Sequence, residues 1–203
     1  RTYGTHVLRT REDDRCFSVA KLFFAYGLGN AQYFPYDVGA SCVLYPNRPT
    51  PEAVFDQVRR HRPTLFFGVP TAYAQMLAAM ERGAPADFSS VRACASAGEA
   101  LPASLFERWR NRTGLEIFDG IGSTEACHMF ASNRDGSVRP GSSGLPVPGY
   151  DLRLPDEGGG ETPDGGIGAL RVRGDSPTGF YWNRPEATKR QLRGGWIARG
   201  DNY

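Results

Sequence analysis

The sequence Asp-Gly-Ile-Gly-Ser-Thr-Glu at residues 119–125 directly follows a short apolar run, residues 115–118, that we expect to be a β-strand. In open α/β sheets, ligands bind at the carboxyl ends of strands, where this turn would lie. Its glycines would let the backbone approach a flat ring or a phosphate, and Glu125 offers a hard oxygen to Mg²⁺. A Gly-rich turn in which Ser123 or Thr124 only caps the next segment explains the same residue types, so the stretch alone leaves both interpretations open.

Upstream of this turn, strands and helices are expected to alternate. Thr50, Pro51 and Glu52 are typical of a helix start, with a hydroxyl at the N-cap, proline at the first helical position and an acid in the first turn. Apolar spacing and terminal glycines predict helix 51–62, strand 64–69, helix 70–82, strand 91–96, helix 102–113 and strand 115–118. Strands joined through helices pair in parallel. Residues 1–138 are therefore predicted to be α/β, a parallel-rich sheet with flanking helices.

The composition changes at residue 139, because 14 of the 25 glycines lie beyond it and interrupt short alternating runs such as residues 169–173. Residues 139–203 are therefore predicted to form a small Gly-rich antiparallel barrel or sheet. The glycines at 158–160 suit a hairpin loop better than a phosphate cradle. The chain has no initiator methionine and ends on what resembles an internal motif. We therefore expect a partial domain.

The charge balance and the apolar runs exclude several classes of protein. The 24 Lys and Arg against 22 Asp and Glu give a net charge of +2, so nucleic acid is not an expected partner. No apolar run reaches the ~20 residues of a bilayer span and no signal segment is visible, so we expect a cytoplasmic protein with no membrane partner. The four cysteines are far apart, which favours reduced structural thiols.

Four stretches in this order and spacing resemble the acyl-adenylate-forming, AMP-binding superfamily of acyl-CoA synthetases, luciferases and peptide-synthetase adenylation domains. They are Lys-Leu-Phe-Phe-Ala-Tyr-Gly-Leu-Gly-Asn at 21–30, Ser-Ala-Gly-Glu-Ala-Leu at 96–101, the stretch at 119–125, and Gly-Gly-Trp-Ile-Ala-Arg-Gly-Asp at 194–201. A weaker stretch, residues 166–182, is similar to a structural motif of the family, with Ala169 where glutamate is usual. The Asp-Gly-Ile-Gly variant and the first stretch resemble benzoate-CoA ligases and related aryl-CoA ligases.

The resemblance implies a nucleotide site. Thr124 would contact the ATP phosphates and Glu125 would hold Mg²⁺, and these two residues would be the catalytic ones. The other residues that would hold ATP or AMP are Ala97, Gly98, Glu99, Asp119, Gly120, Ile121, Gly122, Ser123 and Asp201. Asp201 would accept both ribose hydroxyls, because a carboxylate can take the two donors of a vicinal diol. Arg199 departs from the family's small hydroxyl residue and puts the local turn geometry in doubt.

The resemblance also implies a pocket for an aromatic acid, lined by Ala25, Tyr26, Phe34, Ala97, Gly122, His128 and Met129. Most of these residues are apolar or small, as a flat ring requires. His128 lies four residues after Thr124, so the two face the same way in a helix or a strand. Judged from residue type alone, a lone histidine beside Met129 and Phe130 is more often a core residue, and Tyr26 and Phe34 are equally explained as core aromatics.

The implied reaction is the ATP-dependent activation of a benzoate-like acid to an acyl-adenylate, followed by transfer to coenzyme A with release of AMP and pyrophosphate. Lys21 and Lys189 are the chain's only lysines, and neither fits the phosphate loop or the C-terminal lysine that the family uses. We therefore expect little or no adenylation from this chain alone. Two alternatives remain: an aryl-acid adenylation domain that loads a carrier protein, and a non-catalytic nucleotide-binding module. The sequence leaves open which aromatic acid is used and whether the protein is a monomer or a homodimer.

Overall fold

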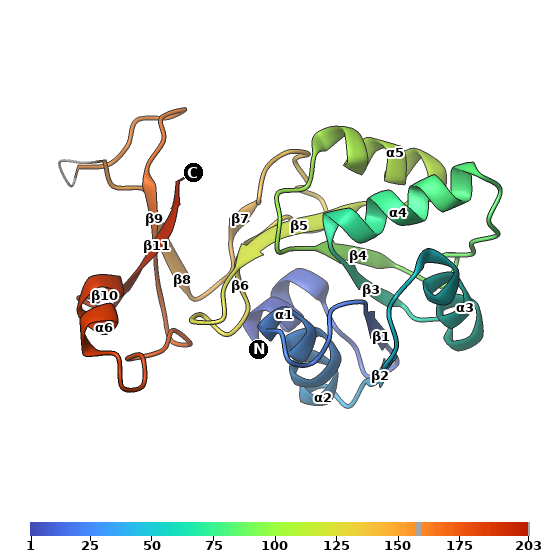
Figure 1. Ribbon diagram of the computed structural model, residues 1–203, viewed down its shortest axis with the longest axis horizontal. Coiled ribbons are helices and arrows are strands. Elements are labelled where there is room, and N and C mark those ends of the chain that lie inside the picture. The colour runs from blue at the N-terminus through green and yellow to red at the C-terminus, as the bar shows by residue number, and fades with distance from the viewer. Residues whose placement is uncertain (157–159, 203) are drawn as a thin grey trace.

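The computed structural model describes residues 1–156 and 160–202, with side chains up to residue 198. Its larger sheet has seven strands in the order β2-β1-β3-β4-β5-β6-β7 (Figure 1). The strands are β1 (Arg15–Ser18), β2 (Ser41–Val43), β3 (Leu65–Gly68), β4 (Ala93–Ser96), β5 (Ile117–Gly122), β6 (Met129–Ser132) and β7 (Leu145–Pro146). Strands β1 to β5 pair in parallel, whereas β6 and β7 are antiparallel. The prediction of a parallel-rich α/β sheet is confirmed.

The predicted helices α3, α4 and α5 begin and end at residues that favour helix termini. In α3 (Pro51–His61), the Thr50 hydroxyl accepts a hydrogen bond from the backbone N–H of Ala53 at 3.3 Å, and the helix ends where Arg62 turns left-handed. Helix α4 (Pro70–Glu81) begins with proline, and α5 (Ala103–Thr113) ends at Gly114, whose φ of 74° suits glycine. These helices cover one face of the sheet (Figure 1), over an apolar core that includes Phe66, Tyr73 and Trp109.

The opposite face is covered by the first 37 residues outside β1, for which the sequence predicts no helix. They form the short helical segments η1 (Tyr3–Leu8), α1 (Ala25–Leu28), η2 (Gly29–Tyr33) and α2 (Phe34–Asp37). Segments of four to six residues are not stable alone. They are held by a second core, which packs Tyr3, Leu8 and Phe34 against Phe67 and Phe118. This face carries the stretch at 21–30 to the edge where β4 and β5 end.

The predicted turn at 119–125 is wrong for its first four residues, because β5 continues through them. Asp119 pairs with Ser96 of β4, and from Gly120 onward the strand pairs with β6. A Cβ atom at Gly120 would lie 2.7 Å from the Ala131 carbonyl oxygen, and one at Gly122 would lie 2.4 Å from that of His128. The neighbouring strand therefore requires both glycines, and the turn itself spans residues 123–128.

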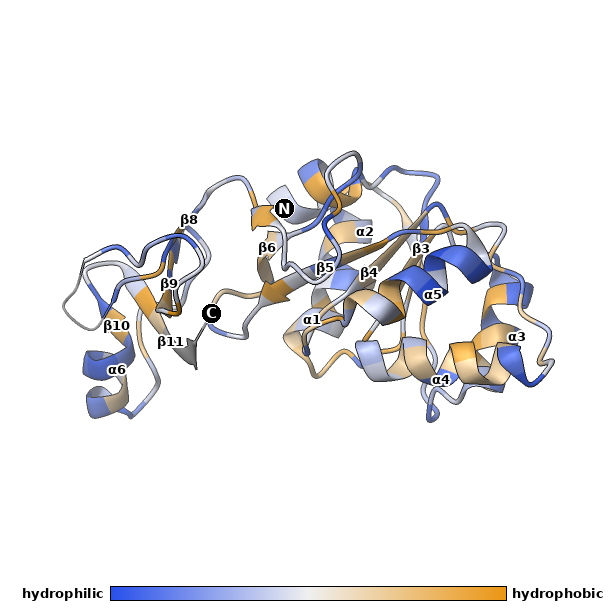
Figure 2. Cartoon of the chain, turned by 90° about the horizontal axis from the view of Figure 1, so that it is seen from above, coloured by the Kyte–Doolittle hydropathy of each residue, from blue (hydrophilic) through white to orange (hydrophobic). Residues whose placement is uncertain are grey.

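The second sheet is a four-stranded antiparallel sheet with the order β10-β11-β9-β8. Its elements are β8 (Tyr150–Arg153), β9 (Ala169–Gly174), α6 (Pro185–Gln191), β10 (Leu192–Arg193) and β11 (Trp196–Asn202). The open sheet is one of the two forms that the sequence left open. Leu170 and Val172 of β9 pack with Ala126 and with Phe130 of β6, whereas α6 is hydrophilic and has no buried residue (Figure 2). Because β7 belongs to the first sheet, this sheet begins after the predicted boundary at residue 139, and the division into two domains stays a prediction.

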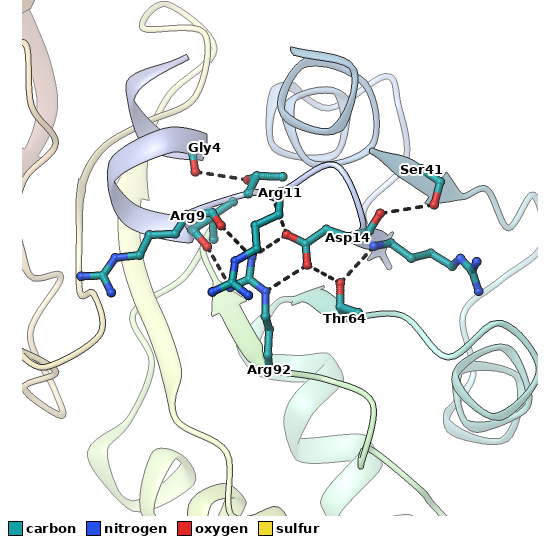
Figure 3. Close-up of polar contacts among 10 residues, drawn as sticks. Gly4, Arg9, Arg11, Asp14, Ser41, Thr64 and Arg92 are labelled. Carbon is teal, nitrogen blue, oxygen red and sulfur yellow. Dashed lines mark hydrogen bonds and ion pairs between the residues drawn. The ribbon is translucent and has the colours of Figure 1, made fainter. Parts of the chain in front are cut away.

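A polar cluster around the buried Asp14 joins the amino ends of three parallel strands. Asp14, Thr64 and Arg92 each directly precede a strand, namely β1, β3 and β4 (Figure 3). The Asp14 carboxylate accepts hydrogen bonds from the Thr64 hydroxyl at 2.6 Å, from Arg92 Nε at 2.9 Å and from the Arg11 backbone N–H at 2.8 Å. Arg92 also donates to the carbonyls of Leu8 and Arg9 at the end of η1. The cluster therefore fastens the N-terminal segment to the sheet.

The four cysteines are free thiols, as predicted, and Cys16 and Cys94 are buried. Among the described residues, the helices are all too short or too polar to cross a membrane.

Candidate functional site

A cavity of about 170 Å³ lies where β4 and β5 end and β6 begins. Four segments build its wall, namely residues 24–26 at the start of α1, 97–98 after β4, 122–124 at the end of β5, and 128–129. The lining residues are Phe24, Ala25, Tyr26, Ala97, Gly98, Gly122, Ser123, Thr124, His128 and Met129. All except Phe24 are residues that the sequence singled out, so the fold brings together segments that are about 100 residues apart.

A larger cavity of about 490 Å³ adjoins the first and shares four wall residues with it, Phe24, Tyr26, Ala97 and Gly98. Its further wall comes from the segments after β1 and β3 and from α4, with Val69, Thr71 and Gln75 among the lining residues. Arg48 contributes a cation at its edge. The sequence did not predict this cavity, because only the fold brings residues 19–20 and 48–49 to the carboxyl ends of β3 and β4.

His128 is buried, and both polar partners of its Nε2 are acceptors, Asn30 Oδ1 at 3.1 Å and the Tyr26 carbonyl at 3.3 Å. The geometry therefore assigns the proton to Nε2. Burial lowers the pKa of His128 to about 3, so the ring is neutral at physiological pH. The Nδ1 atom is buried and has no hydrogen-bond partner among the described residues. His128 is at once a core residue and part of the cavity wall.

Two other residues predicted for the acid pocket take different places. Tyr26 lines the cavity, and its hydroxyl donates to the Gly68 carbonyl at 3.1 Å, which fixes the ring. Phe34 is buried and packs edge-on against His128, with ring centroids 4.6 Å apart, so it supports the wall from behind. Whether either residue contacts a ligand stays a prediction.

The turn at 123–128 presents Thr124 and Glu125 beside the first cavity. The Ser123 hydroxyl accepts from the Ala126 backbone N–H at 3.1 Å, and the backbone N–H of Cys127 donates to the Thr124 carbonyl at 3.1 Å. The Thr124 side chain is exposed, and Glu125 is half-buried, with its carboxylate accepting from the Tyr181 hydroxyl at 3.1 Å. Serine therefore caps the turn, as the structural interpretation of the sequence expected, while Thr124 and Glu125 remain at the surface of the site.

The site fits a magnesium ion only if a substrate completes the coordination. Within the described part of the chain, no group of three or more His, Cys, Asp or Glu side chains could hold a metal. Mg²⁺ is commonly bound by one or two carboxylates together with water and substrate phosphates. A single half-buried carboxylate, Glu125, next to the hydroxyl of Thr124 matches that pattern.

The remaining residues predicted for the nucleotide are spread around the ends of β4 and β5. Gly98 lies in the cavity wall with φ of 94°, and Glu99 is exposed after it. Asp119 is buried and one of its carboxylate oxygens accepts from the Leu101 backbone N–H at 3.4 Å, while burial raises its pKa to about 6. Ile121 packs toward the core of the second sheet. Asp201 belongs to β11, but its side chain lies outside the described residues, so its meeting with Thr124 stays a prediction.

Sequence reasoning missed three residues that shape the site. Phe24 lines both cavities, Asn30 holds His128, and Tyr181 contacts Glu125. Phe24 and Asn30 lie inside the stretch at 21–30, so their position in this motif could have marked them as candidate site residues. Tyr181 lies in the weaker stretch at 166–182, which resembles a structural motif and so does not point to a role in the site.

Three comparisons with known proteins agree with this geometry. Residues 1–182 match the profile of the family described as AMP-binding enzyme. The benzoate–CoA ligase of Thauera aromatica is 52% identical over 202 residues, which cover 99% of this chain and 38% of the relative. A benzoate CoA ligase crystal structure from Burkholderia xenovorans LB400 superposes with a TM-score of 0.95 at 50% identity, covering 100% of this chain and 41% of that one.

A second solved structure, an anthranilate CoA ligase in complex with anthranoyl-AMP, also has a TM-score of 0.95, at 45% identity. The match covers 100% of this chain and 39% of that one. The chain thus spans about two fifths of the length of the proteins it matches.

Proposed function

We propose, from the premise that this chain belongs to the family of AMP-binding enzymes, that the protein activates an aromatic carboxylic acid with ATP and transfers it to coenzyme A. The observation that carries the proposal is the position of the small cavity. Its walls are largely apolar or aromatic, and Thr124 stands at its rim next to Glu125. A ring bound there would present its carboxylate to phosphates held by these two residues.

The reaction would take place in two displacements. An oxygen of the acid's carboxylate attacks the α-phosphorus of ATP, and pyrophosphate leaves. The sulfur of coenzyme A then attacks the acyl carbon, AMP leaves, and the thiol proton passes to solvent. Neither step needs a covalent bond to the protein, so the chain's own task is to hold two anions in line and to shield them from water.

The neutral state of His128 suits the first displacement. A protonated histidine beside the acid would pair with its carboxylate and weaken it as a nucleophile, whereas a neutral ring fills space and leaves the carboxylate reactive. Asn30 and the Tyr26 carbonyl keep the proton on Nε2, so the ring is held as a fixed wall. In this tautomer Nδ1 is a hydrogen-bond acceptor, so it does not pair with the carboxylate of the acid.

Glu125 and Thr124 are the residues we propose for the magnesium ion and the phosphates. When bound, Mg²⁺ would neutralise charge on the phosphate oxygens. Glu125 would supply one carboxylate ligand, and the Thr124 hydroxyl would donate to a phosphate oxygen. The ion pair and hydrogen bonds of the lysines agree with their exclusion from this chemistry. Lys21 donates to the Tyr45 and Asn47 carbonyls, and Lys189 pairs with Glu186 on the exposed face of α6.

The test is pyrophosphate exchange into ATP by the complete protein, with a panel of benzoate, hydroxybenzoates, aminobenzoate and a non-aromatic acid. We expect exchange that depends on an aromatic acid, and an aryl-CoA product when coenzyme A is added. Exchange without any aryl-CoA would favour loading of a carrier protein, and no acid-dependent exchange at all would overturn the proposal. The chain by itself, tested in parallel, should give little or no exchange. A cytoplasmic location belongs to the same proposal.

A further inference from the structure

The turn that carries Thr124 and Glu125 is hydrogen-bonded to the loop that follows β9 in the second sheet. The Thr178 backbone N–H donates to the Glu125 carbonyl at 2.8 Å, and the Ser176 hydroxyl donates to the Ala126 carbonyl at 2.8 Å. The Tyr150 hydroxyl also donates to that carbonyl, at 3.2 Å. Ala126 itself is fully buried in the small core between the two sheets. The backbone of the turn is therefore fixed from the second sheet.

The side chain of Glu125 receives a contact of its own from the same loop. The Tyr181 hydroxyl donates to Glu125 Oε1 at 3.1 Å, across 56 residues of sequence. This contact differs in kind from those of Thr178, Ser176 and Tyr150, because it reaches a carboxylate rather than a backbone carbonyl. It therefore restricts how the carboxylate can rotate, which the other contacts do not do.

Tyr181 is held in place by the residues that begin α6. Its backbone N–H donates to the Thr188 hydroxyl at 3.0 Å, and its carbonyl accepts from the Arg184 backbone N–H at 3.1 Å. The Thr188 hydroxyl in turn donates to the Arg184 carbonyl at 3.0 Å. Both backbone groups of Tyr181 are thus engaged, so its phenol approaches Glu125 from a fixed backbone.

We propose that Tyr181 is a positioning residue for the magnesium ion, a role that rests on the proposed function of Glu125 as metal ligand. A carboxylate has two oxygens and about four lone pairs, so accepting one hydrogen bond leaves capacity for a cation. Hydrogen bonds that orient a metal-ligating carboxylate raise metal affinity, and losing such a partner typically costs roughly 10–100-fold. The motif at 166–182 would then serve the site as well as the fold.

The test uses the complete protein with Tyr181→Phe, which keeps the ring and removes the hydroxyl. ATP binding is followed by calorimetry at graded Mg²⁺ concentrations, with acid-dependent exchange measured under the same conditions. We expect the Mg²⁺ concentration for half-maximal ATP binding to rise by roughly tenfold or more. Exchange should recover at high Mg²⁺, and the apparent affinity for the aromatic acid should not change at saturating Mg²⁺.

The matched control is Tyr150→Phe, which also removes a phenol hydroxyl that contacts the turn, but one that donates to the Ala126 backbone carbonyl instead of a carboxylate. It should leave the Mg²⁺ dependence unchanged. In a Glu125→Gln background, Tyr181→Phe should have no further effect on the Mg²⁺ dependence. An unchanged Mg²⁺ dependence in Tyr181→Phe, or an equal rise in Tyr150→Phe, would overturn the inference. If wild-type protein shows Mg²⁺-dependent ATP binding but no acid-dependent exchange, the proposed function fails instead, and calorimetry still decides the role of Tyr181.

Discussion

Asp14 and Asp119 are buried at opposite ends of the same sheet. The two residues are only 3% and 6% exposed, yet their pKa values shift in opposite directions. Burial alone would raise the pKa of Asp14, but hydrogen bonds from Arg92, Thr64 and Arg11 lower it. Burial raises the pKa of Asp119 to about 6, because the Leu101 backbone N–H and other weaker donors do not compensate.

The difference shows how the two ends of the sheet are used. At the amino ends, a buried charge is satisfied by a cation and by hydroxyl and backbone donors. At the carboxyl ends, His128 Nδ1 is a buried polar atom of a cavity-lining residue that has no hydrogen-bond partner among the described residues, and Asn30 Nδ2, on the residue that holds His128, is another. Unpaired buried polar groups are costly for folding, so we attribute stability to the first end and capacity for ligands to the second.

The comparison would be broken most severely by Arg92→Ala. This change leaves the buried Asp14 carboxylate without its cation. Because the Arg92 side chain is itself 29% exposed, we expect the low end of the cost of breaking a buried pair, about 3 kcal/mol of unfolding free energy. Urea unfolding of the complete protein measures the effect. Arg108→Ala is the control, because Arg108 pairs with Glu81 at a half-exposed surface, where an ion pair contributes about 0–1 kcal/mol. Equal losses in the two variants would contradict a special role for the amino-end cluster.

A pair of Thr→Val changes, one at each end, separates stability from catalysis. Thr124→Val removes a proposed phosphate donor and should raise the barrier of adenylation by about 3 kcal/mol, roughly a hundredfold in rate, with little change in unfolding. Thr64→Val removes a donor to Asp14 and should lower the unfolding free energy by about 1–3 kcal/mol while sparing the rate of the surviving folded protein. Exchange rates and urea midpoints for both variants check this, and a swapped pattern would reverse our assignment.

Asp119→Asn tests the carboxyl end through pH. Because the folded pKa of about 6 lies above the unfolded value of 3.8, wild-type stability should fall as pH rises from 4 to 6. The Asn variant lacks this titration, so its advantage should grow over that range to on the order of 2 kcal/mol. Asp14 has the opposite sign, and its contribution is lost as pH falls through its lowered pKa. Parallel pH profiles for wild type and Asp119→Asn would contradict the raised pKa.

Local signals explain which parts of this picture the sequence could predict. Helices α3, α4 and α5 and strands β3 and β4 were found because caps, glycines and apolar spacing act within a few residues. Strands β1 and β2 have only three or four residues and depend on pairing, β2 with β1 and β1 with β3, so they are too short to show a periodicity in the sequence. The extension of β5 was missed because the glycines at 120 and 122 have the composition of a turn, whereas their reason is the approach of β6.

The site shows the same division. Most wall residues of the small cavity lie in recognisable motifs, so their order in the chain was enough to gather them. Asn30 and Tyr181 act through single hydrogen bonds that span 98 and 56 residues. The motif at 21–30 marks Asn30 as a candidate, but nothing in either residue type indicates its partner, which only the fold identifies.

The smallest expected effect is a change of substrate preference in His128→Ala. The shortened side chain should enlarge the cavity, so kcat/KM should move toward acids with bulkier ring substituents by about tenfold, which corresponds to roughly 1.4 kcal/mol. His61→Ala is the control, because His61 lies exposed at the end of α3. Because burial lowers the pKa of His128 to about 3, removing this ring should also leave the pH profile of exchange unchanged between pH 5 and 8. If His128→Ala removed an inflection near pH 6.5, the imidazole would titrate during catalysis. The assignment of a neutral His128 ring in the cavity wall would then be wrong.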